Sequence, residues 1–127
     1  MRLGPLLLIA SIYMALAGLG FIFAPLAFGA GAVPADPSPA LVHYLRLFGS
    51  PFLGIAVLDW KARNAAPSPL RHAVVLGNLV GFATIAALDI LGLFTGAREV
   101  TKVFAAIHVA FMFAFLWAWR AGRSGGR

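Results

Sequence analysis

Four ionisable residues in apolar surroundings are the side chains here that could do chemistry: His43, Arg46, Asp89 and His108. A charged side chain in the middle of a membrane span costs about 2.5 to 3.5 kcal/mol, so such residues normally find a partner. A guanidinium fits a carboxylate bidentately, and we therefore expect Arg46 to pair with Asp89. His108 could complete the cluster. The alternative is that the long Arg46 stem carries its guanidinium out to the lipid headgroups.

A polar stripe extends from this cluster toward the middle of the predicted membrane spans. His43, Arg46 and Ser50 follow i, i+3 and i+7 spacing, which places them on one helix face. Pro51 removes a helical hydrogen bond, and this predicts a kink that frees a carbonyl. Two interpretations stay open: a tolerated proline kink, or a small polar cavity. The residues that would share such a cavity are Tyr13, Ser50 and Asn78.

The elements that position these residues are predicted to be membrane helices. Of the 127 residues, 61% are hydrophobic and 11% are charged, which excludes an ordinary water-soluble domain. A span needs about 20 apolar residues, and four segments meet that length. The predicted spans are 3–27, 40–60, 70–94 and 101–119. The links between them are short, so we expect one all-α domain over residues 1–127, an up-down four-helix bundle.

Turn residues and basic residues support this organisation. Pro-rich links precede the second and third spans, where Ser38 and Ser68 are predicted helix N-caps, each followed by Pro at the first helical position. With the N-terminus inside, seven basic residues are cytoplasmic, and only Arg98 and Lys102 lie outside. Both termini are therefore expected in the cytoplasm, as is typical of a bacterial inner-membrane protein. The seven are Arg2, Lys61, Arg63, Arg71, Arg120, Arg123 and Arg127.

The first span has an alternative interpretation as a cleaved secretory signal. Arg2, a long apolar stretch and an A-x-A site at residues 30–32 fit that pattern. The apolar stretch, however, is about twice the usual 7 to 15 residues of a signal core. We therefore expect four spans and keep cleavage as the alternative.

A second charged group is expected at the cytoplasmic boundary. Asp59 lies at the inner end of the second span, where the helix dipole disfavours a negative charge. We expect it to pair with Lys61, Arg63 or Arg71 across the short link. The basic residues also attract anionic headgroups.

Composition excludes several kinds of chemistry. The chain has no Cys, so thiolate metal sites, iron–sulfur ligation and thiol catalysis are excluded. No metal site is predicted, because Arg46 would repel a cation beside His43, Asp89 and His108. Haem b is a minor alternative, since His43 and His108 differ in depth by about one turn. Basic residues are spread between apolar segments instead of gathered in a patch, so no nucleic-acid partner is expected.

The sequence resembles the DoxX-like group of small four-helix bacterial membrane proteins. The resemblance rests on four spans in about 130 residues, the stretch Tyr44-Leu45-Arg46-Leu47-Phe48-Gly49, and the following small-residue run Leu53-Gly54-Ile55-Ala56. It implies membership of a quinone-dependent or thiol-related redox complex, as for some members of that group. Without Cys, this chain could not itself exchange thiols.

Two functions are expected from these observations. The first is a subunit without its own catalytic centre, accessory or structural, in a larger membrane assembly or homo-oligomer. The second is a membrane protein that binds a quinone or another lipophilic ligand, because Arg46, His108 and His43 can donate hydrogen bonds to quinone carbonyls.

Overall fold

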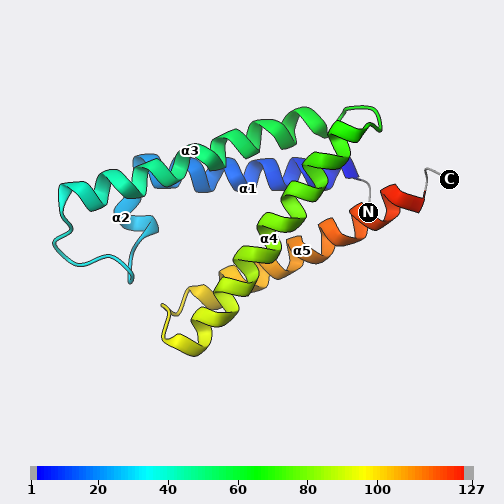
Figure 1. Ribbon diagram of the computed structural model, residues 1–127. Coiled ribbons are helices and arrows are strands. Elements are labelled where there is room, and N and C mark those ends of the chain that lie inside the picture. Colours follow the sequence, from blue (N-terminus) through cyan, green and yellow to red (C-terminus); the bar gives the residue numbers. More distant parts are fainter. Residues whose placement is uncertain (1–2, 125–127) are drawn as a thin grey trace. The chain divides into compact units, whose positions relative to one another are not determined.

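The chain is all-helical over the part that the computed structural model describes, which is residues 3–124, with side chains as far as Gly122 (Figure 1). The basic side chains of Arg2, Arg123 and Arg127 lie outside the described residues. In residues 3–124 the elements are α1 Leu3–Phe23, α2 Pro25–Phe28, α3 Pro39–Ala62, α4 Pro69–Thr95 and α5 Thr101–Ser124.

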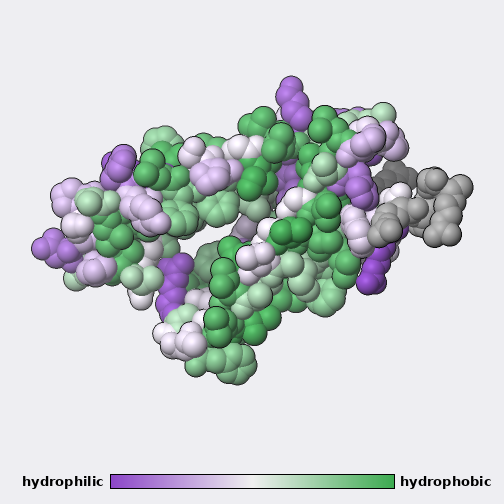
Figure 2. All heavy atoms as spheres, in the orientation of Figure 1, coloured by the Kyte–Doolittle hydropathy of each residue, from purple (hydrophilic) through white to green (hydrophobic). Residues whose placement is uncertain are grey.

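Four of these helices are long and apolar enough to cross a membrane. Their candidate spans contain 21, 24, 27 and 22 residues, against the roughly 20 needed for the hydrocarbon layer. Figure 2 shows hydrophobic side chains along the surfaces of the helices. Large apolar residues are exposed on every long helix, for example Leu16, Val57, Leu88 and Phe113. The predicted all-α class is confirmed, and each of the four predicted spans corresponds to a helix that is long and apolar enough to cross a membrane.

The first helix ends four residues before the predicted boundary. Ala24 leaves the helical region with φ −133° and ψ 52°, because the ring of Pro25 disfavours α conformation in the residue before it. Pro25 then begins the single turn α2. Phe28 folds back to within 5.4 Å of the Phe21 ring centroid. Its ring occupies the space that a side chain at Gly20 would need, so a larger residue at position 20 would displace this ring.

The predicted N-caps of the second and third spans are confirmed. The Ser38 hydroxyl oxygen accepts a hydrogen bond from the Leu41 backbone N–H, and the Ser68 hydroxyl oxygen accepts one from the Arg71 backbone N–H. The nitrogen–oxygen distance is 3.2 Å in both. Proline follows each cap, where its missing N–H costs nothing. The helix α3 continues through Pro51 to Ala62.

The described chain divides into two compact units, which are treated separately below. Residues 7–63 form the α1–α3 unit. Residues 64–124, with residues 3–6, form the α4–α5 unit. The predicted assembly of all four helices into one bundle stays a prediction.

Close backbone contact holds the α1–α3 unit together. A Cβ added at Gly18 would lie 2.9 Å from the Gly49 carbonyl oxygen, and one added at Gly49 would strike the Gly18 carbonyl. The Ser11 hydroxyl donates to the Ala56 carbonyl at 2.8 Å. The early residues of α1 thus meet the late residues of α3, so the two helices run antiparallel.

Aromatic packing holds the α4–α5 unit together. The Phe82 ring stacks on Phe111 at 4.4 Å and on Phe115 at 5.7 Å between centroids. Phe82 and Phe115 are fully buried. The helix α4 ends at Thr95 and is capped by Gly96, whose φ of 85° is a conformation that glycine adopts freely. The short link then reverses the chain into α5.

Candidate functional site

The centre of the candidate site is a contact between Asp89 of α4 and His108 of α5. The His108 Nδ1 atom and the Asp89 Oδ2 atom are 2.6 Å apart. Only 6% of the His108 side chain and 18% of the Asp89 side chain are exposed. The structure therefore brings together two of the four ionisable residues that the sequence singled out.

The α4–α5 turn explains why these residues meet. Asp89 is six residues from the end of α4, and His108 is seven residues after the start of α5. At 1.5 Å per residue both lie about 10 Å from the turn. Phe82, Asn78 and Asp89 share one face of α4, since their spacings of four and seven return to the same side of a helix.

The surroundings of the pair are aromatic. The His108 ring centroid is 6.0 Å from that of Phe82 and 6.1 Å from that of Phe104. Such neighbours exclude water and lower the local dielectric, which strengthens a hydrogen bond that is made and raises the cost of losing it.

The geometry defines the chemistry available to His108. An ionised Asp89 carboxylate only accepts hydrogen bonds, so the imidazole must carry a proton on Nδ1 and donate it. The carboxylate thereby fixes the ring orientation and the tautomer. In the neutral ring, Nε2 is then an acceptor; in the cationic ring it is a donor. A carboxylate-oriented histidine of this kind is suited to hydrogen bonding or proton exchange with a ligand.

Arg46 and His43 belong to the other unit. Both are exposed on α3, and Ser50 continues their stripe with an exposed side chain. All three side chains are exposed, as expected for residues whose spacing places them on one face of α3. The pairing of Arg46 with Asp89 stays a prediction.

The residues expected near the midplane are divided between the two units. Tyr13, which is partly buried, and Ser50 lie in the α1–α3 unit. Asn78 is buried in the α4–α5 unit, where its Nδ2 donates to the Val74 carbonyl of its own helix at 3.0 Å. The proposed cavity shared by all three stays a prediction.

The charged residues predicted at the cytoplasmic boundary are also divided between the two units: Asp59, Lys61 and Arg63 are in the α1–α3 unit, and Arg71 is in the α4–α5 unit. Asp59 is completely buried on α3, whereas Lys61 is exposed. Arg63 Nη1 donates to the Trp60 carbonyl at 2.6 Å, and its guanidinium carbon is 3.3 Å from the centre of the Trp60 ring. Arg71 lies in the first turn of α4. The partner of Asp59 among these basic residues stays a prediction.

Sequence reasoning missed Ser11, whose buried hydroxyl joins α1 to α3. A signal for it was present in the spacing of Leu7, Ser11, Met14 and Gly18. These residues recur every three or four positions and are all buried. A small hydroxyl residue inside such a stripe is typical of a helix interface in membranes.

In the part of the chain that the structure describes, no three His, Asp or Glu side chains gather closely enough to hold a metal ion. Comparison with protein families, with curated proteins and with solved structures gives no match. The four long apolar helices are the features of a multi-pass helical membrane protein.

Proposed function

We propose that this chain is an accessory or structural subunit of a larger assembly in the bacterial inner membrane, with its four spans in one up-down bundle and both termini in the cytoplasm. The orientation rests on the excess of basic residues that this topology places inside. The DoxX-like resemblance supports the bacterial assignment and the role in a complex.

The observation that carries the proposal is the exposed polar stripe on α3. In the apolar window of this helix only 11% of the residues are buried. His43, Arg46 and Ser50 are exposed there, and Arg46 lies seven residues, or about 10 Å, into the helix. Lipid does not solvate a guanidinium at that depth, so protein must cover this face unless Arg46 reaches the headgroups. That protein is either the α4–α5 unit of the same chain or a second polypeptide.

Site-specific photo-crosslinking in native membranes tests this proposal. A benzoylphenylalanine at Ser50 should form a discrete adduct with a second polypeptide, because Ser50 is on the stripe. The matched control is the same group at Tyr44, which is exposed on a different side of α3 and is already aromatic. Crosslinks from Ser50 only to lipid or within the chain, together with a clean monomer in mild detergent, would contradict the subunit role.

The Asp89–His108 pair favours a second candidate function, the binding of a quinone or similar lipophilic ligand. In its cationic form the oriented imidazole could donate a hydrogen bond from Nε2 to a quinone carbonyl between aromatic neighbours. If the two units pack as one bundle, Arg46 and His43 would add further donors. Haem b would need a second histidine at the depth of His108, and His43 is the one available candidate.

Ligand content of the purified protein tests this second function. Quinone should co-purify with the wild-type chain, and His108→Phe should abolish it while preserving the aromatic surroundings. His72→Gln is the control, because this histidine lies at the opposite end of the α4–α5 unit. A wild-type extract without quinone, or equal quinone in wild type and His108→Phe, would exclude the ligand role.

A further inference from the structure

The polar stripe of α3, formed by His43, Arg46 and Ser50, continues inward through Gly54. Gly54 follows Ser50 by four positions, so both lie on the same helix face, and both are exposed. A Cβ added at Gly54 would meet nothing within 4 Å, whereas the neighbouring Gly49 is buried and contacts α1. Small residues four positions apart allow a second helix to approach closely. The space for such a helix at Ser50 and Gly54 is therefore open in the described α1–α3 unit.

Arg46 has no ion-pair partner among the described residues of its own unit. The carboxylates of this unit belong to Asp36 and Asp59. Asp36 lies in the link before α3, whereas Arg46 lies seven residues inside the helix. Asp59 is 13 residues, or about 20 Å, further along α3, and an ion pair needs a separation of about 4 Å or less. A carboxylate that neutralises Arg46 within the span must therefore come from outside this unit.

The carboxylates of the other unit already have partners. Glu99 pairs with Lys102 at the start of α5, and Asp89 pairs with His108, each at 2.6 Å. With the two of the α1–α3 unit, these are the four Asp and Glu residues of the chain. The charge of an arginine is permanent, and in an apolar span it needs an acidic partner. The pairing of these carboxylates therefore favours a partner for Arg46 from a second polypeptide.

The proline of α3 adds a hydrogen-bond acceptor to the same face. Pro51 has no N–H, so the Leu47 carbonyl lacks the donor that an uninterrupted helix would place four residues further on. Leu47 and Pro51 are both exposed beside Ser50. In a bilayer such a carbonyl is satisfied by a hydroxyl or by a neighbouring helix. The face thus presents a guanidinium donor and a backbone acceptor within about one turn of each other.

These features fit a protein helix better than a lipid. A helix that crosses α3 at Ser50 and Gly54 would place a carboxylate opposite Arg46 if its acidic residue lies about one turn, or roughly 6 Å, from the crossing point. The guanidinium can then bind that carboxylate bidentately. A headgroup could meet the guanidinium, but an acyl chain has no donor for the Leu47 carbonyl.

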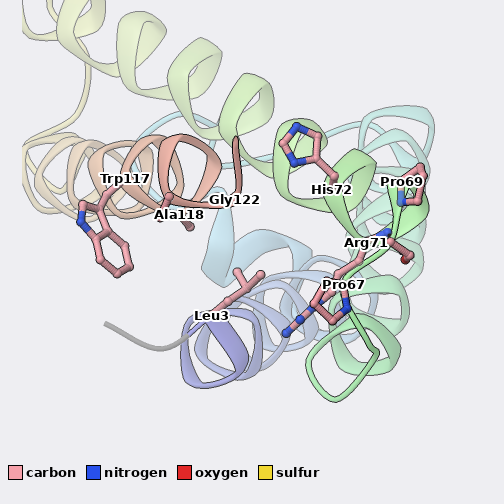
Figure 3. Close-up of a pocket in the computed structure, with 10 residues that line it drawn as sticks. Leu3, Pro67, Pro69, Arg71, His72, Trp117, Ala118 and Gly122 are labelled. Atoms are coloured by element: carbon pink, nitrogen blue, oxygen red, sulfur yellow. Dashed lines mark hydrogen bonds between the residues drawn. The ribbon is translucent and has the colours of Figure 1, made fainter. Parts of the chain in front are cut away.

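The pocket of the α4–α5 unit differs from this face, because its polar side chains do not converge. It has a volume of about 570 Å³ and lies at the end of the unit opposite the α4–α5 turn. Its lining comes from the start of α1, the approach to α4 with its first turn, and the end of α5 (Figure 3). Figure 3 shows the Arg71 and His72 side chains pointing in different directions. The α3 stripe, in contrast, gathers its polar groups on one side of one helix.

We infer that the α3 stripe binds a transmembrane helix of a second polypeptide that carries an Asp or Glu side chain about one turn from the crossing point. The carboxylate pairs with Arg46, and the partner backbone passes over Ser50 and Gly54. The inference rests on the proposed subunit role and deepens it, because it names the chemistry of the neighbouring subunit.

Association with designed membrane peptides tests this inference. The probe is a Leu/Ala helix of about 21 residues with a central Gly and one Glu a turn away, and the control peptide carries Gln in place of Glu. Because the chain has no Cys, Ala35→Cys in the exposed link before α3 can carry a donor dye, and energy transfer to a labelled peptide in mild detergent measures binding. The full-length protein should bind the Glu peptide about tenfold more tightly than the Gln peptide. Equal affinities would overturn the inference.

Matched variants locate the binding face. Arg46→Gln should remove the preference for the Glu peptide, whereas Lys61→Gln, which removes an exposed basic side chain at the other end of α3, should keep it. Gly54→Leu should weaken the binding of both peptides by filling the open space. Gly77→Leu, at an equally open glycine of α4, should leave both unchanged. Equal losses within either pair of variants would show that the peptide binds elsewhere. Unfolding of each variant without peptide verifies its fold.

Two competing occupants give different results. If Asp89 holds Arg46 within the chain, the Glu preference should appear only in Asp89→Asn. If a headgroup holds Arg46, added phosphatidylglycerol should abolish the preference. Either result would exclude the acidic partner helix.

The peptide experiment and the crosslinking experiment fail separately. A discrete Ser50 adduct without a Glu preference would leave the subunit role in place and remove the acidic partner. A Glu preference without any Ser50 adduct in native membranes would remove the subunit role and leave the binding chemistry of the face.

Discussion

The two units hold their helices together by different means. In the α1–α3 unit the backbones touch at Gly18 and Gly49, and a single hydroxyl bridges to a carbonyl. In the α4–α5 unit, large rings fill the interface and an ionisable pair crosses it. Lipid chains are as apolar as the side chains they surround, so hydrophobic burial contributes little to either contact.

The comparison shows that glycine content alone does not locate a helix interface. Gly77 and Gly81 of α4 have the G-x-x-x-G spacing that favours close helix approach. A Cβ added at either position would meet nothing within 4 Å, because the face that meets α5 is that of Phe82 and Asp89. Rings on this face hold the axes apart, and the glycines lie to the side of the contact.

The largest expected effect is that of a bulky residue at Gly49. Gly49→Leu should destabilise the protein by about 3 kcal/mol, because the new side chain meets the Gly18 carbonyl and the backbone must move apart. Unfolding in mixed micelles of mild detergent and dodecyl sulfate measures this change. The matched control, Gly81→Leu, should change the free energy of unfolding by about 0.5 kcal/mol or less. Equal losses in the two variants would show that the backbone contact is no more demanding than an open helix face.

The next largest effect is expected at the ionisable pair. His108→Phe should cost about 2 kcal/mol, because it removes the hydrogen-bond donor of a mostly buried carboxylate. The double variant Asp89→Leu with His108→Phe should recover part of the loss, since no charge is then left without its partner. The same unfolding experiment measures both. A double variant as unstable as the sum of its single changes would mean that the contact contributes no coupling.

Much of this architecture could be predicted from the sequence. The four apolar segments, their approximate bounds and the serine caps follow from length, composition and turn residues. The common depth of Asp89 and His108 also follows, since both are counted from the same short turn. Rules based on neighbouring residues are sufficient to predict features whose residues are close along the chain.

The remaining features depend on side-chain packing that residue counting does not supply. Depth alone matched Asp89 with Arg46 as well as with His108, and the contact with His108 depends on the rotation of α4 against α5, which residue counting does not give. The early end of α1 depends on the effect of Pro25 on Ala24, which hydropathy does not register. The pocket at the start of α4 joins residues from three distant segments.

A smaller effect tests whether the two units pack as one bundle. Arg46→Gln and Asp89→Asn should show a coupling of about 1 kcal/mol in a double-mutant cycle if the predicted pair forms beside His108. Arg46→Lys should then also be destabilising, because an ammonium cannot make the bidentate contact. A near-neutral Arg46→Lys with coupling below about 0.5 kcal/mol would instead support a guanidinium that reaches the headgroups.

The smallest effect is expected at the hydroxyl bridge of the α1–α3 unit. Ser11→Ala should cost about 0.6 kcal/mol, a typical contribution of a polar contact between membrane helices. The loss is small because Ala56 lies within α3 and its carbonyl can keep its own helical hydrogen bond, so no buried acceptor is stranded. Thr84→Val is the matched control, because the Thr84 hydroxyl donates to the Val80 carbonyl within its own helix and this hydrogen bond does not connect two helices. The control should be neutral within about 0.3 kcal/mol. A Ser11→Ala loss comparable to that of His108→Phe would mean that one hydroxyl, and not the glycine contact, is the main link between α1 and α3.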